Sequence, residues 1–216
     1  MKLMDLTHTI KENMCVFPGT EPPELIAANT IKKDGFRETL LKMYSHTGTH
    51  MDAPAHLFDG LNTLDMFAPD QFAGRALIVD CSHLKEGERA AMADVRRYGK
   101  LSDEAEYLLF RFGWDAHWGT DRYFSEYPCI DEKIAHYMVE TGKKGIGLDT
   151  ISVDPLADKN LTLHRVLLST NRMVIVENLC GLREVPEGLF SFFALPLKFA
   201  RADGAPVRAV AALDKG

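Results

Sequence analysis

The sequence contains few cysteines, and those few lie far apart. Cys15, Cys81, Cys129 and Cys180 are the four in 216 residues, and they form no C-x-x-C pair. This spacing excludes a zinc-ribbon site and a dithiol redox motif, so free and largely buried thiols are expected. With 46% hydrophobic residues, a chain of this length can bury a substantial core without a disulfide or a metal staple.

Long apolar runs and clusters of positive charge are also missing. No stretch of about eighteen apolar residues occurs, and the opening "MKLMDLTHTIKENM" is too polar for a signal peptide, so we expect a cytoplasmic protein that does not span a membrane. The 25 basic and 31 acidic residues give a formal charge of -6, and the basic residues are scattered. This distribution favours a small-molecule substrate over nucleic acid or an anionic membrane surface.

Nothing in the composition divides the chain, because it contains no internal repeat, low-complexity tract or flexible linker. A single domain over residues 1–216 is therefore expected. Short runs of apolar and β-branched residues predict strands. These runs are Ala76–Val79, Tyr107–Phe112, Gly145–Leu148, Met173–Val176, Phe192–Phe199 and Val207–Leu213.

Apolar residues at helical spacing predict helices over Asp131–Thr141 and Leu161–Ser169. Between the last two predicted strands, the dipeptide Asp203-Gly204 is typical of a turn, so the C-terminal region is expected to form an antiparallel hairpin. The combined pattern predicts a mixed α/β fold with a central sheet or barrel.

Ligand-type side chains are concentrated in the segment 45–56, "SHTGTHMDAPAH". They are His46, His50, Asp52 and His56. Their even spacing would put them on one face of an extended chain, but a straight strand would spread His46 and Asp52 over about 20 Å. Metal ligands must converge to about 2.0 to 2.2 Å from the ion. Because Gly48 and Pro54 favour a bend, we expect these ligands on a tight loop.

A solvated polar loop is the alternative interpretation of this segment. Imidazole and carboxylate groups at such density favour a metal site, and they suit zinc, manganese or iron better than calcium or magnesium. The remaining histidines have no nearby partner in the sequence and are expected to be structural. They are His8, His83, His117 and His136.

The pattern H-x-G-T-H-x-D-x-P-x-H over residues 46–56 resembles that of the metal-dependent cyclase-like hydrolases, a family that includes bacterial kynurenine formamidases (arylformamidases) and isatin hydrolases. The resemblance extends through "FPGTEPP", "WGTDRYF", "GLDTISVDP", "LHRVLL", "VIVENL" and "FFALPLK". It implies a compact α/β domain of the cyclase-like, swivelling β/β/α type, with a mixed sheet or β-barrel-like core flanked by helices. It also implies a homodimer or a higher homo-oligomer.

The resemblance further implies a centre for one or two divalent ions, with zinc expected and manganese as the alternative. By this resemblance, the ligands of the first ion are His46, His50 and Asp52. Those of the second ion are Asp52, His164 and Glu177. From the residues alone, His164 would count as a structural histidine in a helix. Glu177 is either a surface residue just past a strand or a buried carboxylate that needs a partner.

By the same resemblance, His56 is the acid/base and not a permanent ligand. Its ordinary pKa near 6.5 suits proton transfer at neutral pH. The implied reaction is hydrolysis of the carbon–nitrogen bond of an aryl formamide such as N-formylkynurenine, by water that the metal activates. Ring opening of isatin or another cyclic amide or lactone is the alternative. A catalytically silent binding protein and a cyclase or dehydratase remain open, although a proton shuttle favours an enzyme.

Kynurenine formamidases commonly have an aromatic residue, usually tryptophan, before the N-terminal Pro-Gly pair, where this sequence has Phe17. Phenylalanine keeps the stacking face but lacks the indole donor, so the resemblance implies that Phe17 binds substrate, with core packing as the alternative. Three further aromatic residues are expected to belong to the core, namely Trp114, Trp118 and Tyr123.

Overall fold

The computed structural model describes residues 1–213, and its centre is an eight-stranded sheet in which seven strands close on one another. The closed order is β12 (Gly204–Leu213), β11 (Leu189–Pro196), β5 (Ala73–Asp80), β7 (Tyr107–Arg111), β9 (Gly145–Leu148), β10 (Val174–Glu177) and β4 (His50–Asp52), which pairs again with β12. The eighth strand, β1 (Lys2–Asp5), is added to β12. Strands β5, β7, β9 and β10 are parallel and the other pairings are antiparallel. The expected mixed, barrel-like sheet is therefore confirmed.

Successive residues of β7 point alternately into and out of this barrel. Tyr107 and Leu109 belong to the interior cluster, whereas Leu108 and Phe110 belong to the cluster that packs under the helices. A strand buried on both faces needs a continuous apolar run, which is why "YLLF" could be recognised in the sequence.

Small residues make room inside the barrel. A Cβ atom on Gly147 of β9 would lie 2.6 Å from the Leu109 side chain and 2.7 Å from that of Leu179. Strand β12 contributes further small residues to the same interior, namely Ala205, Ala209 and Ala211. The barrel is thus filled by side chains, so a substrate site has to lie outside it.

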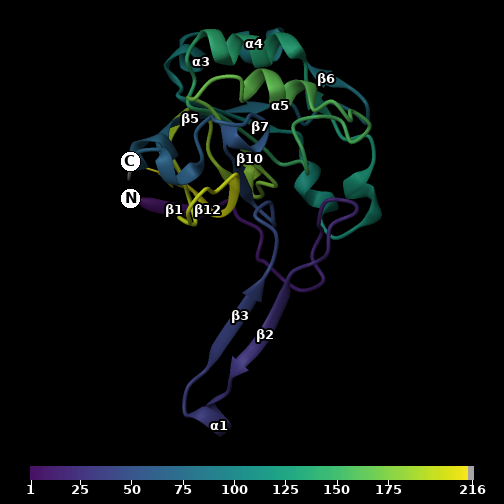
Figure 1. Cartoon of the computed structure of the whole chain (residues 1–216). Coiled ribbons are helices and arrows are strands. Elements are labelled where there is room, and N and C mark those ends of the chain that lie inside the picture. The colour runs from purple at the N-terminus through teal and green to yellow at the C-terminus, as the bar shows by residue number, and fades with distance from the viewer. Residues whose placement is uncertain (214–216) are drawn as a thin grey trace.

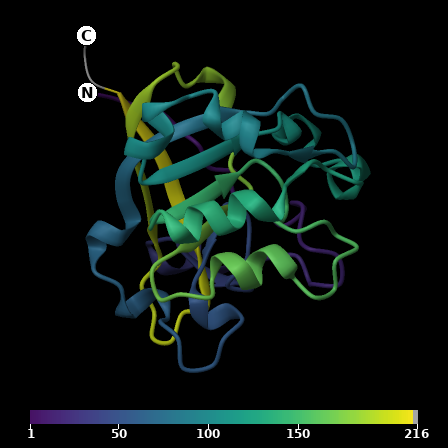
Figure 2. The same ribbon diagram turned by 90° about the horizontal axis from the view of Figure 1, so that it is seen from above.

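Helices α4 (Glu132–Glu140) and α5 (Thr162–Leu167) lie side by side over one outer face of the sheet (Figures 1 and 2). Helix α4 begins at Asp131, whose carboxylate accepts a hydrogen bond from the Ile134 backbone N–H at 2.9 Å. Both predicted helices are confirmed, with ends that differ by one or two residues. The shorter elements are α2 (Met92–Arg96), α3 (Lys100–Glu104), β6 (Arg89–Ala90) and β8 (Cys129–Ile130).

A hairpin that the sequence analysis did not predict projects from the body like an arm (Figure 1). It consists of β2 (Glu24–Asn29) and β3 (Glu38–Lys42), which are antiparallel, with the short helix α1 (Ile31–Asp34) at its tip. We call residues 24–42 the arm.

The six predicted strands are confirmed as β5, β7, β9, β10, β11 and β12, and the C-terminal hairpin is antiparallel as expected. Strand β11 covers Leu189–Pro196, so it begins and ends earlier than the predicted Phe192–Phe199, and the prediction is wrong for residues 197–199. The prediction of a turn at Asp203-Gly204 is wrong, because the chain turns at Ala200 and Arg201 and Gly204 already pairs with β4. Among residues 1–213, no helix has the length and apolar character needed to cross a bilayer.

Candidate metal centre

The histidine-rich segment bends as expected and then enters the sheet. Gly48 has a φ of 67°, in the left-handed region that glycine favours. Ala53 is extended, as a residue before proline should be. The prediction of a loop for all ligands is nevertheless wrong for His50 and Asp52, which lie on β4. The ladders that β4 forms with both β10 and β12 hold these residues in a strand.

The strand register explains why three ligand-type side chains meet. His50 of β4 lies directly opposite Glu177 of β10, and Met51 belongs to the barrel interior. Because side chains alternate along a strand, His50 and Asp52 both point away from that interior. Glu177 ends β10 and is only 4% exposed, so it is not a surface residue past the strand.

The structure brings the five expected ligands into one cluster. His46 Nδ1 is 2.7 Å from Asp52 Oδ1, and His50 Nε2 is 3.3 Å from the same oxygen. On the other side, His164 Nε2 is 3.4 Å from Asp52 Oδ2 and 3.3 Å from Glu177 Oε1. Three groups have ligand atoms within 4.8 Å of one another. Two of them share Asp52 and are the expected sets, namely His46, His50, Asp52 and Asp52, His164, Glu177. The third consists of His46, His56 and Asp203.

The arrangement fits a divalent ion. Asp52 is 1% exposed, yet its buried Oδ2 has no hydrogen-bond partner among the described residues. Leaving a buried carboxylate oxygen unpaired is costly unless a cation binds it. The spacings of 3.3 and 3.4 Å around His164 also match the roughly 3.3 Å expected between atoms that share a tetrahedral ion at about 2.0 to 2.2 Å.

Outer hydrogen bonds orient two of the histidines. The Nδ1 atom of His50 lies 2.8 Å from the Gly48 carbonyl, and that of His164 lies 2.7 Å from Asp154 Oδ2. If each Nδ1 carries the proton, each Nε2 is left free to act as a ligand. The role of Asp154 was missed by the sequence analysis, although an Asp-Pro pair shortly before a helix could have pointed to a capping carboxylate.

Electrostatics also favour a cation here. Burial alone lowers the pKa of His46, but the carboxylates of Asp52 and Asp203 raise it to about 10. Burial raises the pKa of Asp52, but His46 and His50 hold it well below its ordinary value. Four carboxylates face the histidines of the centre, namely Asp52, Asp154, Glu177 and Asp203. A pKa of about 10 leaves His46 protonated at neutral pH when no metal is bound, and a bound dication would replace that proton in offsetting the negative charge.

His56 lies beside the cluster and belongs to neither of the groups that share Asp52, although it forms the third group with His46 and Asp203. Its ring centroid is 4.2 Å from that of His46 and 6.1 Å from that of His164. No side chain or backbone group of residues 1–213 hydrogen-bonds its imidazole. Burial lowers its pKa, so the ring is neutral and able to accept a proton.

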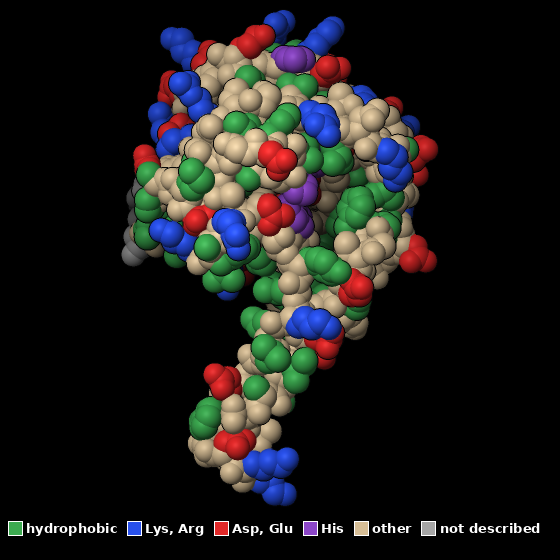
Figure 3. Space-filling view, viewed as in Figure 1, with side chains coloured by type: hydrophobic (Ala, Val, Ile, Leu, Met, Phe, Trp, Pro, Cys, Tyr) green, Lys and Arg blue, Asp and Glu red, His purple; other side chains and the backbone are tan. Residues whose placement is uncertain are grey.

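A cavity of about 410 Å³ opens onto the centre, and Phe17, Tyr44, Ile151 and Leu161 form its apolar walls. Phe17 is 41% exposed at its edge, so it is not a core residue. Histidine side chains reach the surface in the hollow just above the root of the arm (Figure 3). The cavity volume suits a small aromatic molecule.

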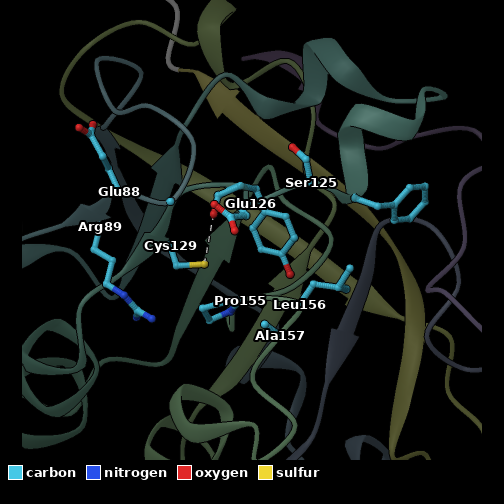
Figure 4. A pocket seen from close by; sticks show the side chains of 11 residues that line it. Glu88, Arg89, Ser125, Glu126, Cys129, Pro155, Leu156 and Ala157 are labelled. Atoms are coloured by element: carbon cyan, nitrogen blue, oxygen red, sulfur yellow. Dashed lines mark hydrogen bonds between the residues drawn. The ribbon is translucent and has the colours of Figure 1, made fainter.

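A larger cavity of about 610 Å³ lies elsewhere, with Arg89, Cys129, Pro155 and Leu156 in its lining (Figure 4). Burial raises the pKa of the Cys129 thiol to about 12, so this cysteine is not a nucleophile at neutral pH. Among the described residues, none of the groups able to hold a metal lies in this cavity. The smaller cavity is therefore the candidate active site.

The histidines expected to be structural lie outside the ligand groups. His8 stacks on Trp118 with ring centroids 3.9 Å apart. Trp114 and Tyr123 are buried, and Trp118 packs partly buried against the same cluster, as expected.

Comparison with known proteins places this chain in a family. The model of a family described as "Putative cyclase" matches residues 4–155. The chain belongs to this cyclase family. The kynurenine formamidase of Bacillus cereus is 33% identical over 209 residues, which cover 96% of this chain and 95% of the relative. That of Salinibacter ruber is 32% identical over 213 residues, which cover 97% of each.

Solved structures agree with this assignment. An isatin hydrolase bound to the product analogue thioisatinate aligns with 99% of this chain and 93% of its own, at a TM-score of 0.87 and 22% identity, which shows the shared fold. A structure described as a potential metal-dependent hydrolase with cyclase activity aligns over 97% of this chain and 98% of its own, at a TM-score of 0.75 and 26% identity. The chain is thus a hydrolytic enzyme of the cyclase family, and its relatives support metal-dependent amide hydrolysis.

Proposed function

We propose that this enzyme hydrolyses the carbon–nitrogen amide bond of a small aromatic formamide, with N-formylkynurenine as the leading substrate. The observation that carries the proposal is the buried, unpartnered Asp52 Oδ2, which lies between two groups of ligand-type side chains beside a cavity of about 410 Å³. The kynurenine formamidases at 32% and 33% identity support the choice of substrate.

In this proposal the two ligand groups hold one or two divalent ions. His46, His50 and Asp52 hold the first, and Asp52, His164 and Glu177 the second. Zinc is the proposed ion and manganese the alternative, because imidazole and carboxylate ligands suit both. A bound ion of this kind lowers the pKa of water towards about 7 and polarises a carbonyl oxygen.

The protein's own residues then orient the substrate and move the proton. One of the two ring nitrogens of His56, which hydrogen-bond to nothing in the described chain, takes the proton from the attacking water and returns it to the leaving nitrogen. Phe17 stacks on the aryl ring, while Ile151 and Leu161 exclude water from that side of the cavity. The products are formate and an arylamine.

Ring opening of isatin is the second candidate. Phe17 offers a stacking face without the indole donor of the tryptophan that is usual in kynurenine formamidases, and such a face accommodates a flat cyclic amide as well as a formamide.

Metal analysis of the purified protein, followed by absorbance assays with zinc or manganese, tests the proposal. We expect turnover of N-formylkynurenine to exceed that of isatin, and His50→Ala to lose both metal and activity. A protein that cannot be loaded with any divalent metal would refute the mechanism. A metal-loaded protein that turns over neither compound would refute the substrate, and one that turns over isatin alone would establish the second candidate.

A further inference from the structure

Asp203 and Gly204, for which the sequence predicted a turn, lie against the metal centre. Asp203 Oδ2 is 3.1 Å from His46 Nε2 and also accepts a hydrogen bond from the Ser45 hydroxyl at 3.4 Å. The Asp203 carbonyl accepts a hydrogen bond from the backbone N–H of Ala53 at 2.9 Å. Both the backbone and the carboxylate of Asp203 are therefore tied to the histidine-rich segment.

Gly204 leaves the space that the His46 ring occupies. In the ladder between β12 and β4, Gly204 is paired with Asp52, which is one of the proposed ligands. A Cβ atom on Gly204 would lie 2.4 Å from His46 Cε1 and 2.7 Å from His46 Nε2. Any side chain at this position would push the imidazole away from its present place.

The two ring nitrogens of His46 have the opposite roles to those of His50 and His164. His50 and His164 engage Nδ1 with an outer acceptor and turn Nε2 towards the carboxylates of the centre. In His46 the outer acceptor, Asp203, engages Nε2, and Nδ1 lies 2.7 Å from Asp52 Oδ1. A neutral imidazole carries one N–H, so a proton on Nε2 leaves the lone pair on Nδ1.

We propose that Asp203 and Gly204 position His46 so that it binds metal through Nδ1, with the proton on Nε2 held by Asp203. This inference rests on the proposed function, because it concerns the ion shared by His46, His50 and Asp52. Asp203 acts here as a positioning residue. Its carboxylate lies within hydrogen-bonding distance of His46, and its side chain is 47% exposed, unlike the buried Asp52.

Zinc affinity, measured by chelator competition on the full chain, gives a readout that is independent of activity. We expect Asp203→Ala to weaken one zinc-binding event about 10- to 100-fold, which is the usual effect of removing an outer partner of a metal-bound histidine. Asp203→Asn keeps an acceptor and should weaken it less. Asp59→Asn, at an exposed aspartate outside the centre, is the matched control and should leave zinc affinity unchanged.

A double-mutant cycle separates positioning of His46 from a general structural effect. Gly204→Ala should weaken zinc binding as Asp203→Ala does, since both displace the same ring. In a His46→Ala background, neither substitution should lower the affinity further. If Gly204→Ala fails to fold, the Asp203 variants carry the cycle alone.

Long-range ¹H–¹⁵N correlation spectra of the zinc-loaded protein should show the proton of His46 on Nε2 and those of His50 and His164 on Nδ1. His46 protonated on Nδ1 would overturn the inference, as would wild-type zinc affinity in Asp203→Ala. A further loss of affinity on adding Asp203→Ala to His46→Ala would make Asp203 a ligand itself and also overturn it. These results leave the proposed function standing if the wild-type protein binds zinc, whereas a wild-type protein that binds no divalent metal refutes both.

Discussion

His56 differs from the other three histidines of the centre, because neither of its ring nitrogens hydrogen-bonds within the described chain and it belongs to neither of the two ligand groups that share Asp52. We expect His56→Ala to lower kcat about 100- to 10,000-fold, the usual contribution of general acid–base catalysis. Its metal content should equal that of the wild type. Initial rates at saturating substrate, together with metal analysis, check both statements, and full activity in His56→Ala would remove the proposed role.

The free energy of unfolding should depend on pH through His8. Burial against Trp118 lowers the pKa of His8 to about 4, whereas the unfolded chain binds this proton near 6.5. Between these values the unfolded state holds more protons, so stability should fall as the pH is lowered from 6.5 to 4. Allowing for partial exposure, we expect a loss of about 1 to 2 kcal/mol. Urea unfolding at pH 7 and pH 4.5 should show this loss in the wild type, and a smaller loss in His8→Phe, which keeps the stacked ring.

At the residue scale, the sequence was sufficient to identify those ligands that lie close together along the chain. His46, His50 and Asp52 could be grouped because two bend-forming residues separate and follow them. Asp203 could not be found in this way, since it reaches His46 through the pairing of β12 with β4, and Asp-Gly is more typical of a turn.

At the element scale, the buried parallel strands could be predicted and the exposed or very short ones could not. Strands β5, β7 and β9 carry apolar runs, because both of their faces are covered. Strand β4 has only three residues, too few to show a period, and its neighbours keep it extended. The arm was missed, although Asp34-Gly35 between two apolar runs is a hairpin signal that could have revealed it.

Packing inside the barrel predicts the effect of one added methyl group. Gly147→Ala would place a Cβ atom 2.6 Å from Leu109 and 2.7 Å from Leu179, so we expect a loss of about 1 to 3 kcal/mol in the free energy of unfolding. Gly74→Ala in β5 is the comparison variant and should lose less stability, because its Cβ atom would meet only the half-exposed side chain of Glu106, at 2.8 Å from Oε2, and that side chain can move at the cost of its hydrogen bond from the Arg75 N–H. Urea denaturation of both variants tests this, and equal stabilities would contradict the packing argument.

At the scale of the whole molecule, the arm exposes apolar side chains on a hairpin that no other strand or helix of residues 1–213 covers. Ile26, Leu40 and Leu41 are 41%, 55% and 55% exposed, and an isolated two-stranded hairpin is marginally stable in water. The body offers a second exposed apolar set near the end of β11, with Leu195 and Leu197 at 53% and 60%. We propose a two-fold homodimer in which the arm of each copy packs on the body of the other.

Gel filtration with light scattering of the eluted protein tests the proposed homodimer. We expect the wild type to have twice the mass of the chain, Leu40→Asn with Leu41→Asn to shift towards monomer, and Glu38→Gln on the same strand to remain dimeric. A monomeric wild type at micromolar concentration would refute the dimer, and an unchanged double variant would refute the role of the arm. The cytoplasmic location also stays a prediction.

The central claim is a metal centre in which Asp52 serves both ligand groups, and metal content measured by mass spectrometry tests it most directly. After loading with zinc and gel filtration, the wild type should retain one or two ions for each chain. Asp52→Asn should retain none, because Asp52 is common to both proposed ligand groups, whereas Glu177→Gln should lose at most the ion of the second group. Wild-type zinc content in folded Asp52→Asn would contradict the account.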